Sequence, residues 1–577
     1  MYKSGENYNL LRVLLFPLIL FFFITLNFSQ NYKIDNITIS GNNYFKAKKL
    51  KERLKLKKGD LFYNSILQED ISELNKFYEE NGFLNKQIST KYSIKNQKVF
   101  IEYQIFEGKQ SFFKKIIADK QYDSIVKKYL SSRYTRNKLN TIKSEIINKL
   151  NNRGFFKPVV DITDISVNDF EKIIKIKVKP GQKFYFGQLY ISGLNNIKEK
   201  AIFRRKNFKK GELFSKSKVI HFKKELFKLN VFSDLSIKYY ETDSNIIDIF
   251  LDVKEDKFKW IGMNIGYTTP ATTRLGFEWG NNNFLNNLLV VKLNNENEYD
   301  FDNDFYKFNL DLGLTKKWFL FKKLDMNNSI GFEFEKDSKS KNSKIYFQSN
   351  LIKEISEDFT VQLGYEKKLT FYEEIETEEA EENIDKWLTA NNIIAKVYFD
   401  NIRRKINPVN DSIYISFYNR LSGGFIGGDW RYYYHNIESA IYKNLYKNKF
   451  ISLLHLNYKR YSEFNNELLV PYDELISLGG VYDIRGYNYS GIGDNFYSSY
   501  VFNLAERIKL YKNLWVELFL DGGKGFKKNG ELNLTNIKYS TGVELRYLIS
   551  ILVFRVGYAK KVTDKGSLIY FSLGQMF

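Results

Sequence analysis

The residue types on which most enzymes and metal sites depend are scarce in this sequence. It contains no cysteine, which excludes disulfides, thiolate nucleophiles and thiolate metal ligands. Its three histidines lie far apart, without the spacing of metal ligands: His221, His435 and His455. The other residues show no constellation for acid–base or nucleophilic catalysis. The sequence therefore predicts a protein that is not an enzyme and has no metal ion or other cofactor.

The acidic residues Glu517 and Asp521 stand in a segment that alternates between two kinds of residue. Positions of one parity are apolar, namely Leu514, Val516, Leu518 and Leu520. Positions of the other parity are Trp515, Glu517, Phe519 and Asp521. Successive side chains of a strand point to opposite faces, and a charged side chain is costly on a face that contacts lipid. We therefore expect Glu517 and Asp521 to point into the lumen of a membrane barrel.

Similar alternating segments of about ten residues fill the chain from residue 257 to residue 577. We count sixteen of them, from 258–268 at the start to 567–577 at the end. The chain also has only six prolines, and proline is excluded from central strands because it cannot donate a backbone hydrogen bond. The pattern predicts an all-β, sixteen-stranded antiparallel transmembrane barrel over residues 257–577. An even number of strands places both ends of the barrel on the same side of the membrane.

Ahead of the barrel, an α+β unit of roughly 70 to 75 residues recurs three times. We refer to residues 31–108, 109–183 and 184–256 as repeats 1, 2 and 3. Repeat 1 has the order strand, helix, helix, strand, strand (β-α-α-β-β), with an amphipathic helix at 65–80 and an alternating strand at 99–105. We expect each repeat to pack two helices on one sheet.

The repeats hold most of the formal charge of +22. This excess favours contact with anionic lipid headgroups or acidic partners. The alternative is a lysine-rich composition that only solvates helix faces.

The N-terminus has the pattern of a secretory signal. Lys3 and Arg12 precede an apolar run at 13–26, and small and polar residues follow at 27–30. The run is shorter than the roughly 20 residues that a membrane-spanning helix needs, although an uncleaved membrane anchor is the alternative. The pattern predicts a signal peptide at residues 1–30. Nucleic acid is not an expected partner of an exported chain.

The most specific stretch lies between the eleventh and twelfth predicted strands, in a segment at 465–495 that the strand count places outside the cell. It reads Leu478-Gly479-Gly480-Val481-Tyr482-Asp483-Ile484-Arg485-Gly486-Tyr487. This run matches the GG…[V/I]RG[F/Y] motif of the outer-membrane assembly factor superfamily, which includes BamA, TamA and the two-partner secretion transporters. The repeats resemble the polypeptide-transport-associated (POTRA) domains of that superfamily. With three repeats, the chain is most similar to TamA-like members.

The resemblance implies that this loop folds back into the barrel and that Arg485 pairs with Asp521. A guanidinium and a carboxylate can form two parallel hydrogen bonds, which suits a confined lumen. The residues that match the motif are Gly479, Gly480, Ile484, Arg485, Gly486 and Tyr487. Gly486 would allow a tight turn, and Tyr487 would pack against the wall.

Two further sets of residues follow from the resemblance. The family has a second acidic partner on the strand after the loop, where Glu506 is the nearest candidate. Alternation, however, places Glu506 with Leu504 and Ile508 on the lipid face. In the last strand, Phe571, Leu573 and Phe577 share one face, which resembles the signal by which barrel proteins are themselves assembled.

The resemblance implies an outer-membrane protein assembly or translocation factor, with its repeats in the periplasm of a bacterium. Its repeats would capture unfolded outer-membrane proteins, and its first and last strands would part to insert them. The expected partners are these clients, outer-membrane lipid and, at repeat 1, an inner-membrane-anchored partner that spans the periplasm. A two-partner-type secretion pore is one alternative. A passive pore or a lipid-transport conduit is another.

Overall fold

The computed structural model describes residues 32–573 except for 167, 243–244, 269–271, 301–304, 337–339, 377–380, 383–385, 403–409, 447, 528–532 and 550–551. The predicted signal peptide at 1–30 and Phe577 lie outside the described residues. The chain divides into two compact units. The first comprises repeats 1 and 2 with parts of repeat 3, and the second comprises the rest of repeat 3 with the barrel.

Repeat 1 is a three-stranded sheet with two helices. Its elements are β1 (Lys33–Ser40), α2 (Ala47–Lys51), α3 (Asn64–Glu80), β2 (Gln87–Lys95) and β3 (Lys98–Phe106). Strand β3 lies in the middle, parallel to β1 and antiparallel to β2. The alternation of β3 buries Val99, Ile101 and Tyr103 in one core with Leu74 and Phe77 of α3. The amphipathic helix and the alternating strand therefore pack as their sequence patterns predict.

Repeats 2 and 3 have the same strand order, with the last strand in the middle of each sheet. Helix α5 begins after Thr135, whose Oγ1 accepts the Lys138 N–H at 3.2 Å as an N-cap. The elements of repeat 2 are β4 (Phe112–Ile117), η1 (Lys120–Tyr122), α4 (Asp123–Val126), η2 (Lys127–Tyr129), α5 (Arg136–Asn151), β5 (Val159–Asp164) and β6 (Glu171–Lys179). Those of repeat 3 are β7 (Tyr185–Ser192), α6 (Glu199–Phe203), α7 (Lys216–Phe227), β8 (Phe232–Glu241) and β9 (Ile246–Glu255).

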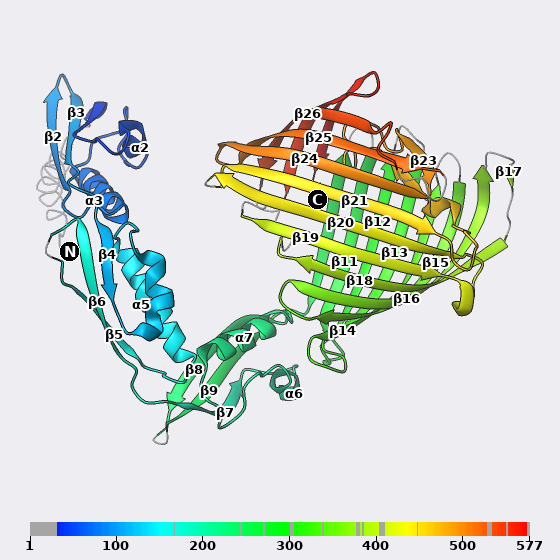
Figure 1. Cartoon of the computed structure of the whole chain (residues 1–577), viewed down its shortest axis with the longest axis horizontal. Helices are drawn as coiled ribbons and strands as arrows, with labels where there is room; N and C mark the ends of the chain where they lie inside the picture. Colours follow the sequence, from blue (N-terminus) through cyan, green and yellow to red (C-terminus); the bar gives the residue numbers. More distant parts are fainter. Residues whose placement is uncertain are drawn as a thin grey trace, which may run out of the picture. The chain divides into compact units, whose positions relative to one another are not determined.

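The rest of the chain forms a closed antiparallel barrel (Figure 1). In the described residues it has sixteen long strands and a two-residue strand, β17 (Glu381–Glu382). The long strands are β10 (Lys259–Thr268), β11 (Thr272–Phe284), β12 (Leu289–Asp300), β13 (Phe305–Lys316), β14 (Leu324–Lys336), β15 (Ser340–Glu354), β16 (Phe359–Glu376), β18 (Lys386–Asp400), β19 (Ser412–Ser422), β20 (Tyr432–Tyr446), β21 (Phe450–Ser462), β24 (Ser498–Tyr511), β25 (Leu514–Phe526), β26 (Lys538–Leu548), β27 (Val553–Lys561) and β28 (Ser567–Leu573). The predicted fold class, α+β repeats followed by a sixteen-stranded barrel, is confirmed.

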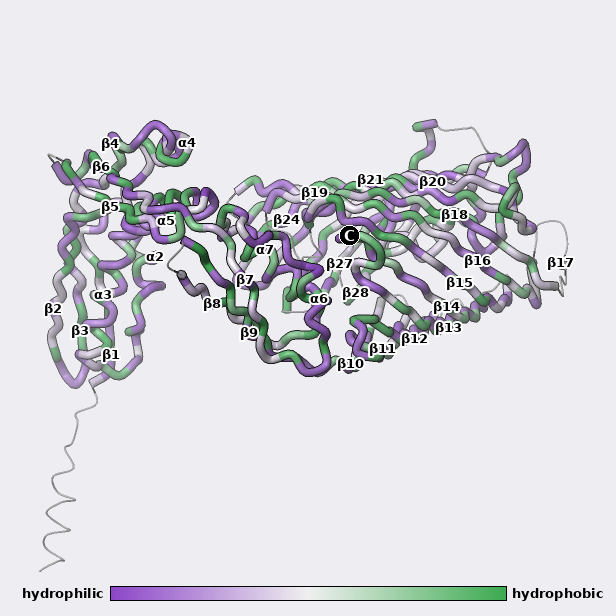
Figure 2. The backbone as a smooth tube through the Cα atoms, turned by 90° about the horizontal axis from the view of Figure 1, so that it is seen from below, coloured by the Kyte–Doolittle hydropathy of each residue, from purple (hydrophilic) through white to green (hydrophobic). Residues whose placement is uncertain are grey.

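Side chains alternate between the inside and the outside of the barrel along its strands. On β25, Glu517 and Asp521 are fully buried, whereas Leu518 and Leu520 are exposed on the outer surface. Hydrophobic and hydrophilic positions alternate in the same way along the barrel strands in Figure 2. Both acidic residues therefore point into the lumen, as their parity predicts. Among the described helices, none has the length and apolar character of a membrane-spanning helix.

The barrel closes where its first strand, β10, meets its last strand, β28. Ten residues of β10 pair with β11, from Lys259 to Thr268. Within the described residues, β10 and β28 share the single register pair Thr268↔Ser572. We call this junction the seam.

Candidate functional site in the barrel lumen

The loop between β21 and β24 carries the motif recognised in the sequence, and we call residues 463–497 the lumen loop. It contains the short paired strands β22 (Ile476–Leu478) and β23 (Gly493–Phe496). Gly480 bridges Ile484 across a tight turn, and the Gly480 N–H donates to Tyr487 O at 3.1 Å. Gly486 has a φ of +94°, and a Cβ there would lie 3.1 Å from Ala559 Cβ on β27. A glycine therefore allows the loop both to turn and to lie against the wall.

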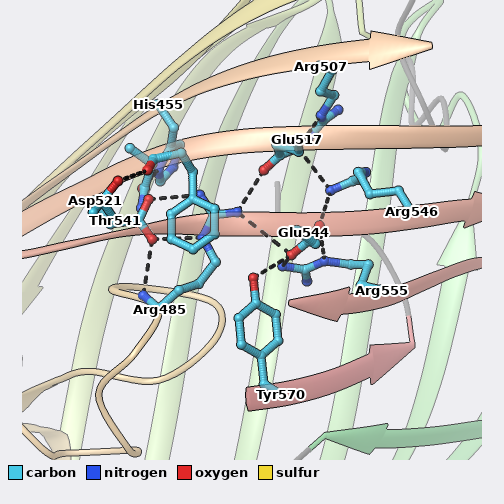
Figure 3. A network of polar contacts seen from close by, with 12 residues as sticks. His455, Arg485, Arg507, Glu517, Asp521, Thr541, Glu544, Arg546, Arg555 and Tyr570 are labelled. Atoms are coloured by element: carbon cyan, nitrogen blue, oxygen red, sulfur yellow. Dashed lines mark hydrogen bonds and ion pairs between the residues drawn. The ribbon is translucent and has the colours of Figure 1, made fainter. Parts of the chain in front are cut away.

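Arg485 is the centre of a buried ion cluster. Its Nε and Nη2 donate to the two carboxylate oxygens of Asp521 at 2.7 and 2.8 Å, and its backbone N–H donates to Oδ2 at 3.1 Å. Its Nη1 donates to Glu517 Oε1 at 2.7 Å, and its guanidinium lies 3.5 Å from the ring centroid of Phe519. Figure 3 shows the guanidinium with Asp521 on one side and Glu517 and Glu544 on the other. The structure thus brings together Arg485 and Asp521, the pair that the resemblance implies, in the bidentate geometry expected of a guanidinium and a carboxylate.

The cluster extends over the last five strands of the barrel. Glu517 also accepts from Arg507 of β24 at 2.5 Å and from Arg546 of β26 at 3.1 Å. Glu544 of β26 accepts from Arg546 at 2.8 Å and from Arg555 of β27 at 2.9 Å. Each of these side chains is fully buried. Burying a charge is tolerated when it is paired and hydrogen-bonded, so removing one member leaves the others uncompensated.

Glu506 lies outside this cluster, so the expectation of a second partner at Glu506 is wrong. Its Oε1 accepts from Ser452 Oγ at 2.5 Å, on the outer side of the wall. The β24–β25 register places Glu506 opposite Leu518 and Arg507 opposite Glu517, and no bulge intervenes between these positions. Plain alternation therefore holds, and Glu517 serves as the second acidic partner of Arg485.

The remaining predicted residues are Tyr487 at the end of the motif and the apolar residues of the last strand. The hydroxyl of Tyr487 donates to Asp564 Oδ2 at 2.7 Å, which ties the end of the motif to the connection between β27 and β28. Phe571 and Leu573 share the outer face of β28, opposite the inward Tyr570 and Ser572. Within the described residues, no group of three or more His, Asp or Glu side chains has a metal-binding arrangement.

A second anchor holds the lumen loop to a different part of the wall, and the sequence analysis missed it. Asp473 lies 2.7 Å from Lys344 Nζ on β15 and accepts from the Tyr372 hydroxyl of β16 at 2.5 Å. Glu474 accepts from Arg420 of β19 at 2.5 Å. Glu474 also accepts from Lys368 and, at 3.0 Å, from Tyr432, and its carbonyl oxygen accepts from Tyr461 at 2.7 Å. The loop is therefore tied to β15, β16 and β19–β21 as well as to β25.

We expect the replacement Glu474→Gln to destabilise the folded barrel by about 3 kcal/mol or more, because Arg420 and Lys368 lose a shared buried carboxylate. The unfolding midpoint in denaturant, followed by the gel shift of the folded barrel, measures the effect. Glu467→Gln is the matched control. It removes a carboxylate of the same loop that pairs with Arg431 at 2.5 Å but is about half exposed, so we expect a loss of less than about 1 kcal/mol. Equal midpoints for the two variants would contradict the second anchor.

Comparisons with known proteins agree with this architecture. The Omp85 superfamily domain matches residues 261–577, and the surface antigen variable number repeat, a POTRA family, matches 32–108 and 113–181. The outer membrane protein assembly factor BamA of Buchnera aphidicola is 25% identical over 359 residues, which cover 57% of each chain. BamA of Neisseria meningitidis is 20% identical over 233 residues, 37% of this chain and 29% of that protein. The match therefore spans little more than half the length of the first of these curated relatives and less than a third of the second.

Solved structures show the same fold. BamA from Haemophilus ducreyi lacking POTRA domains 1–3 has a TM-score of 0.61 and 17% identity, and covers 80% of this chain and 98% of that one. CdiB from Acinetobacter baumannii has a TM-score of 0.51 and 14% identity, and covers 88% and 98%. The predicted superfamily is confirmed, while the closer likeness to TamA stays a prediction. The chain belongs to the Omp85 superfamily, as an outer-membrane β-barrel with periplasmic POTRA repeats.

Proposed function

We propose that this protein inserts or translocates other proteins at the outer membrane, through the seam between β10 and β28. Relatives named as outer membrane protein assembly factors support an assembly role. Because the chain spans little more than half of the first of them, the clients and the mechanism are part of the proposal. In this view the protein is a TamA-like assembly factor.

The observation that carries the proposal is the seam itself, where the first and last strands close the barrel at Thr268 and Ser572. Within the described residues, β10 and β28 share one register pair, whereas β27 and β28 pair from Phe554↔Leu573 to Lys560↔Ser567. Parting two strands in lipid exposes unpaired N–H and C=O groups, each at a cost of several kcal/mol. An open seam therefore has two strand edges whose N–H and C=O groups are unsatisfied. Once open, it favours an incoming strand that satisfies its edges.

The position of the lumen loop helps to choose between assembly, a passive pore and a two-partner-type secretion pore. Its two anchors reach inward-facing side chains of the wall on β15, β16, β19–β21 and β25. A loop that crosses the lumen between anchors obstructs a passive pore, which makes the passive-pore alternative the weaker one. A two-partner-type secretion pore remains the second candidate function. The fold shared with CdiB supports it but does not separate it from assembly.

The repeats supply surfaces suited to holding an extended client. In repeat 1 the edge strand β2 is exposed along nearly its whole length. An extended segment can add to such an edge through main-chain hydrogen bonds. We assign client capture to these edges, and we place an inner-membrane-anchored partner at repeat 1.

Depletion of the protein followed by quantitative outer-membrane proteomics tests the proposed function. We expect a several-fold fall in a set of β-barrel proteins while outer-membrane lipoproteins keep their levels. Complementation with the parent chain or with Glu467→Gln should restore the barrel proteins. Unchanged barrel proteins together with altered lipid composition would reject assembly in favour of a lipid conduit. Loss of a single secreted substrate would instead favour the secretion pore.

A further inference from the structure

The tip of the lumen loop reaches the seam. Tyr482 lies in the turn that Gly480 and Ile484 close. Its hydroxyl lies 3.1 Å from Ser572 Oγ and donates to Leu573 O at 3.5 Å, both on β28. Within the part of β28 that the structure describes, Ser572 is the residue that pairs with β10. The loop therefore bonds to the last strand at the point where the barrel closes.

The ring of Tyr482 also contacts the other side of the seam. The guanidinium of Arg274 on β11 lies 5.9 Å from the ring centroid, within the range of a cation–π contact. Arg274 is fixed by Glu298 of β12 at 2.9 Å. On β10, which runs between β11 and β28, the residue opposite Arg274 is Gly266. Because glycine adds no side chain, Tyr482 can span the inner face of the first strand from β11 to β28.

The last strand is also linked to the ion cluster. Tyr570 of β28 donates from its hydroxyl to Glu544 Oε2 at 2.7 Å, and the same oxygen lies 3.7 Å from Arg485 Nη1 (Figure 3). Arg485 follows Tyr482 by three residues in the chain. When Arg485 is paired with Asp521, Tyr482 is therefore held near Ser572.

We propose that Tyr482 is a positioning residue that keeps the seam closed while the lumen loop is anchored. Parting β10 from β28 requires the hydroxyl to leave Ser572 and Leu573, or the ring to leave Arg274. The loop thereby controls access to the seam. This inference rests on the proposed function, to which it adds the element that regulates opening.

Spin labels across the seam test this role directly, because the protein has no native cysteine. Cysteines replace Ile265 on β10 and Ile569 on β28, whose side chains are 64% and 72% exposed on the outer wall. Dipolar spectroscopy in lipid bilayers then gives the distance distribution between the two labels. Tyr482→Phe keeps the ring and removes the hydroxyl. We expect the population with long distances to rise about fivefold, which is the effect of one lost hydrogen bond.

Two further variants complete the test. Arg274→Gln should raise the same population about twofold to fivefold by removing the cation–π contact. Tyr497→Phe is the matched control, because this loop tyrosine lies at β25, where its N–H donates to Phe526 O. We expect it to leave the distances unchanged. If Tyr482→Phe does not fold, Ser572→Ala removes the same contact from the side of β28.

We call the role of Tyr482 in keeping the seam closed the latch, and the outcomes separate it from the proposed function. An unchanged distribution in folded Tyr482→Phe, or an equal change in Tyr497→Phe, overturns the latch. Client insertion is measured in the same samples. More frequent opening with unaltered insertion supports the latch and contradicts insertion through the seam. Altered insertion at unchanged distances overturns the latch and leaves the proposed function standing.

Discussion

Replacing Arg485 with alanine should lower the free energy of unfolding of the barrel by about 3 to 5 kcal/mol, the cost of breaking a buried ion pair by removing one partner. Arg485 is fully buried and makes four hydrogen bonds to Asp521 and Glu517. Three of these come from the side chain and are lost. Two carboxylates then remain in the lumen wall with fewer positive partners.

The effect is measured as a shift of the denaturant midpoint of the purified full chain in lipid vesicles, read from the gel mobility of folded and unfolded forms. Arg431→Ala is the matched control, because Arg431 pairs with Glu467 of the same loop at 2.5 Å but is 42% exposed. We expect less than about 1 kcal/mol there. Arg485→Lys should recover only part of the loss, since an ammonium cannot reproduce the two-pronged contact. Equal midpoints for Arg485→Ala and Arg431→Ala would show that the cluster does not stabilise the barrel.

The sequence allows the architecture to be predicted because strands of a barrel alternate with a period of two. The same parity that marks Leu518 and Leu520 as lipid-facing marks Glu517 and Asp521 as inward-facing. Parity also places Glu506 outside, and here it proved a better guide than the family resemblance. In the repeats, the one-sided helix α3 and the alternating strand β3 form the expected core.

Much of the ion cluster could not be predicted from the sequence. Parity shows which face of the wall a side chain occupies, but not its position along the barrel axis relative to the neighbouring strands. Glu544 and Arg546 have inward parity on β26, yet only the register shows that Glu517 lies opposite Glu544. The arginine Arg555 depends in turn on the β26–β27 register, where it lies opposite Arg546. The second anchor is harder to predict than the ion cluster, because Asp473 and Glu474 lie in an irregular loop without periodicity. Their adjacent carboxylates were the one available signal.

Locking the seam with a disulfide should abolish insertion of clients. Among the residues that the structure describes, Thr268 and Ser572 pair across the seam. Opposite residues of an antiparallel pair have Cα atoms about 4.5 to 5.5 Å apart, which a disulfide can bridge. Thr268→Cys with Ser572→Cys is therefore the double replacement that joins β10 to β28 at this register pair. The double replacement Tyr558→Cys with Ile569→Cys is the matched control, because it joins β27 to β28 at a register pair away from the seam.

The most direct test measures the folding of an unfolded barrel client into vesicles that contain the full chain with the oxidised seam disulfide. The account predicts that folding falls to the level of empty vesicles. Reduction should restore it, and the oxidised control pair at β27 and β28 should leave it unaltered. Client folding at the parent rate with the seam fully crosslinked would contradict insertion between β10 and β28.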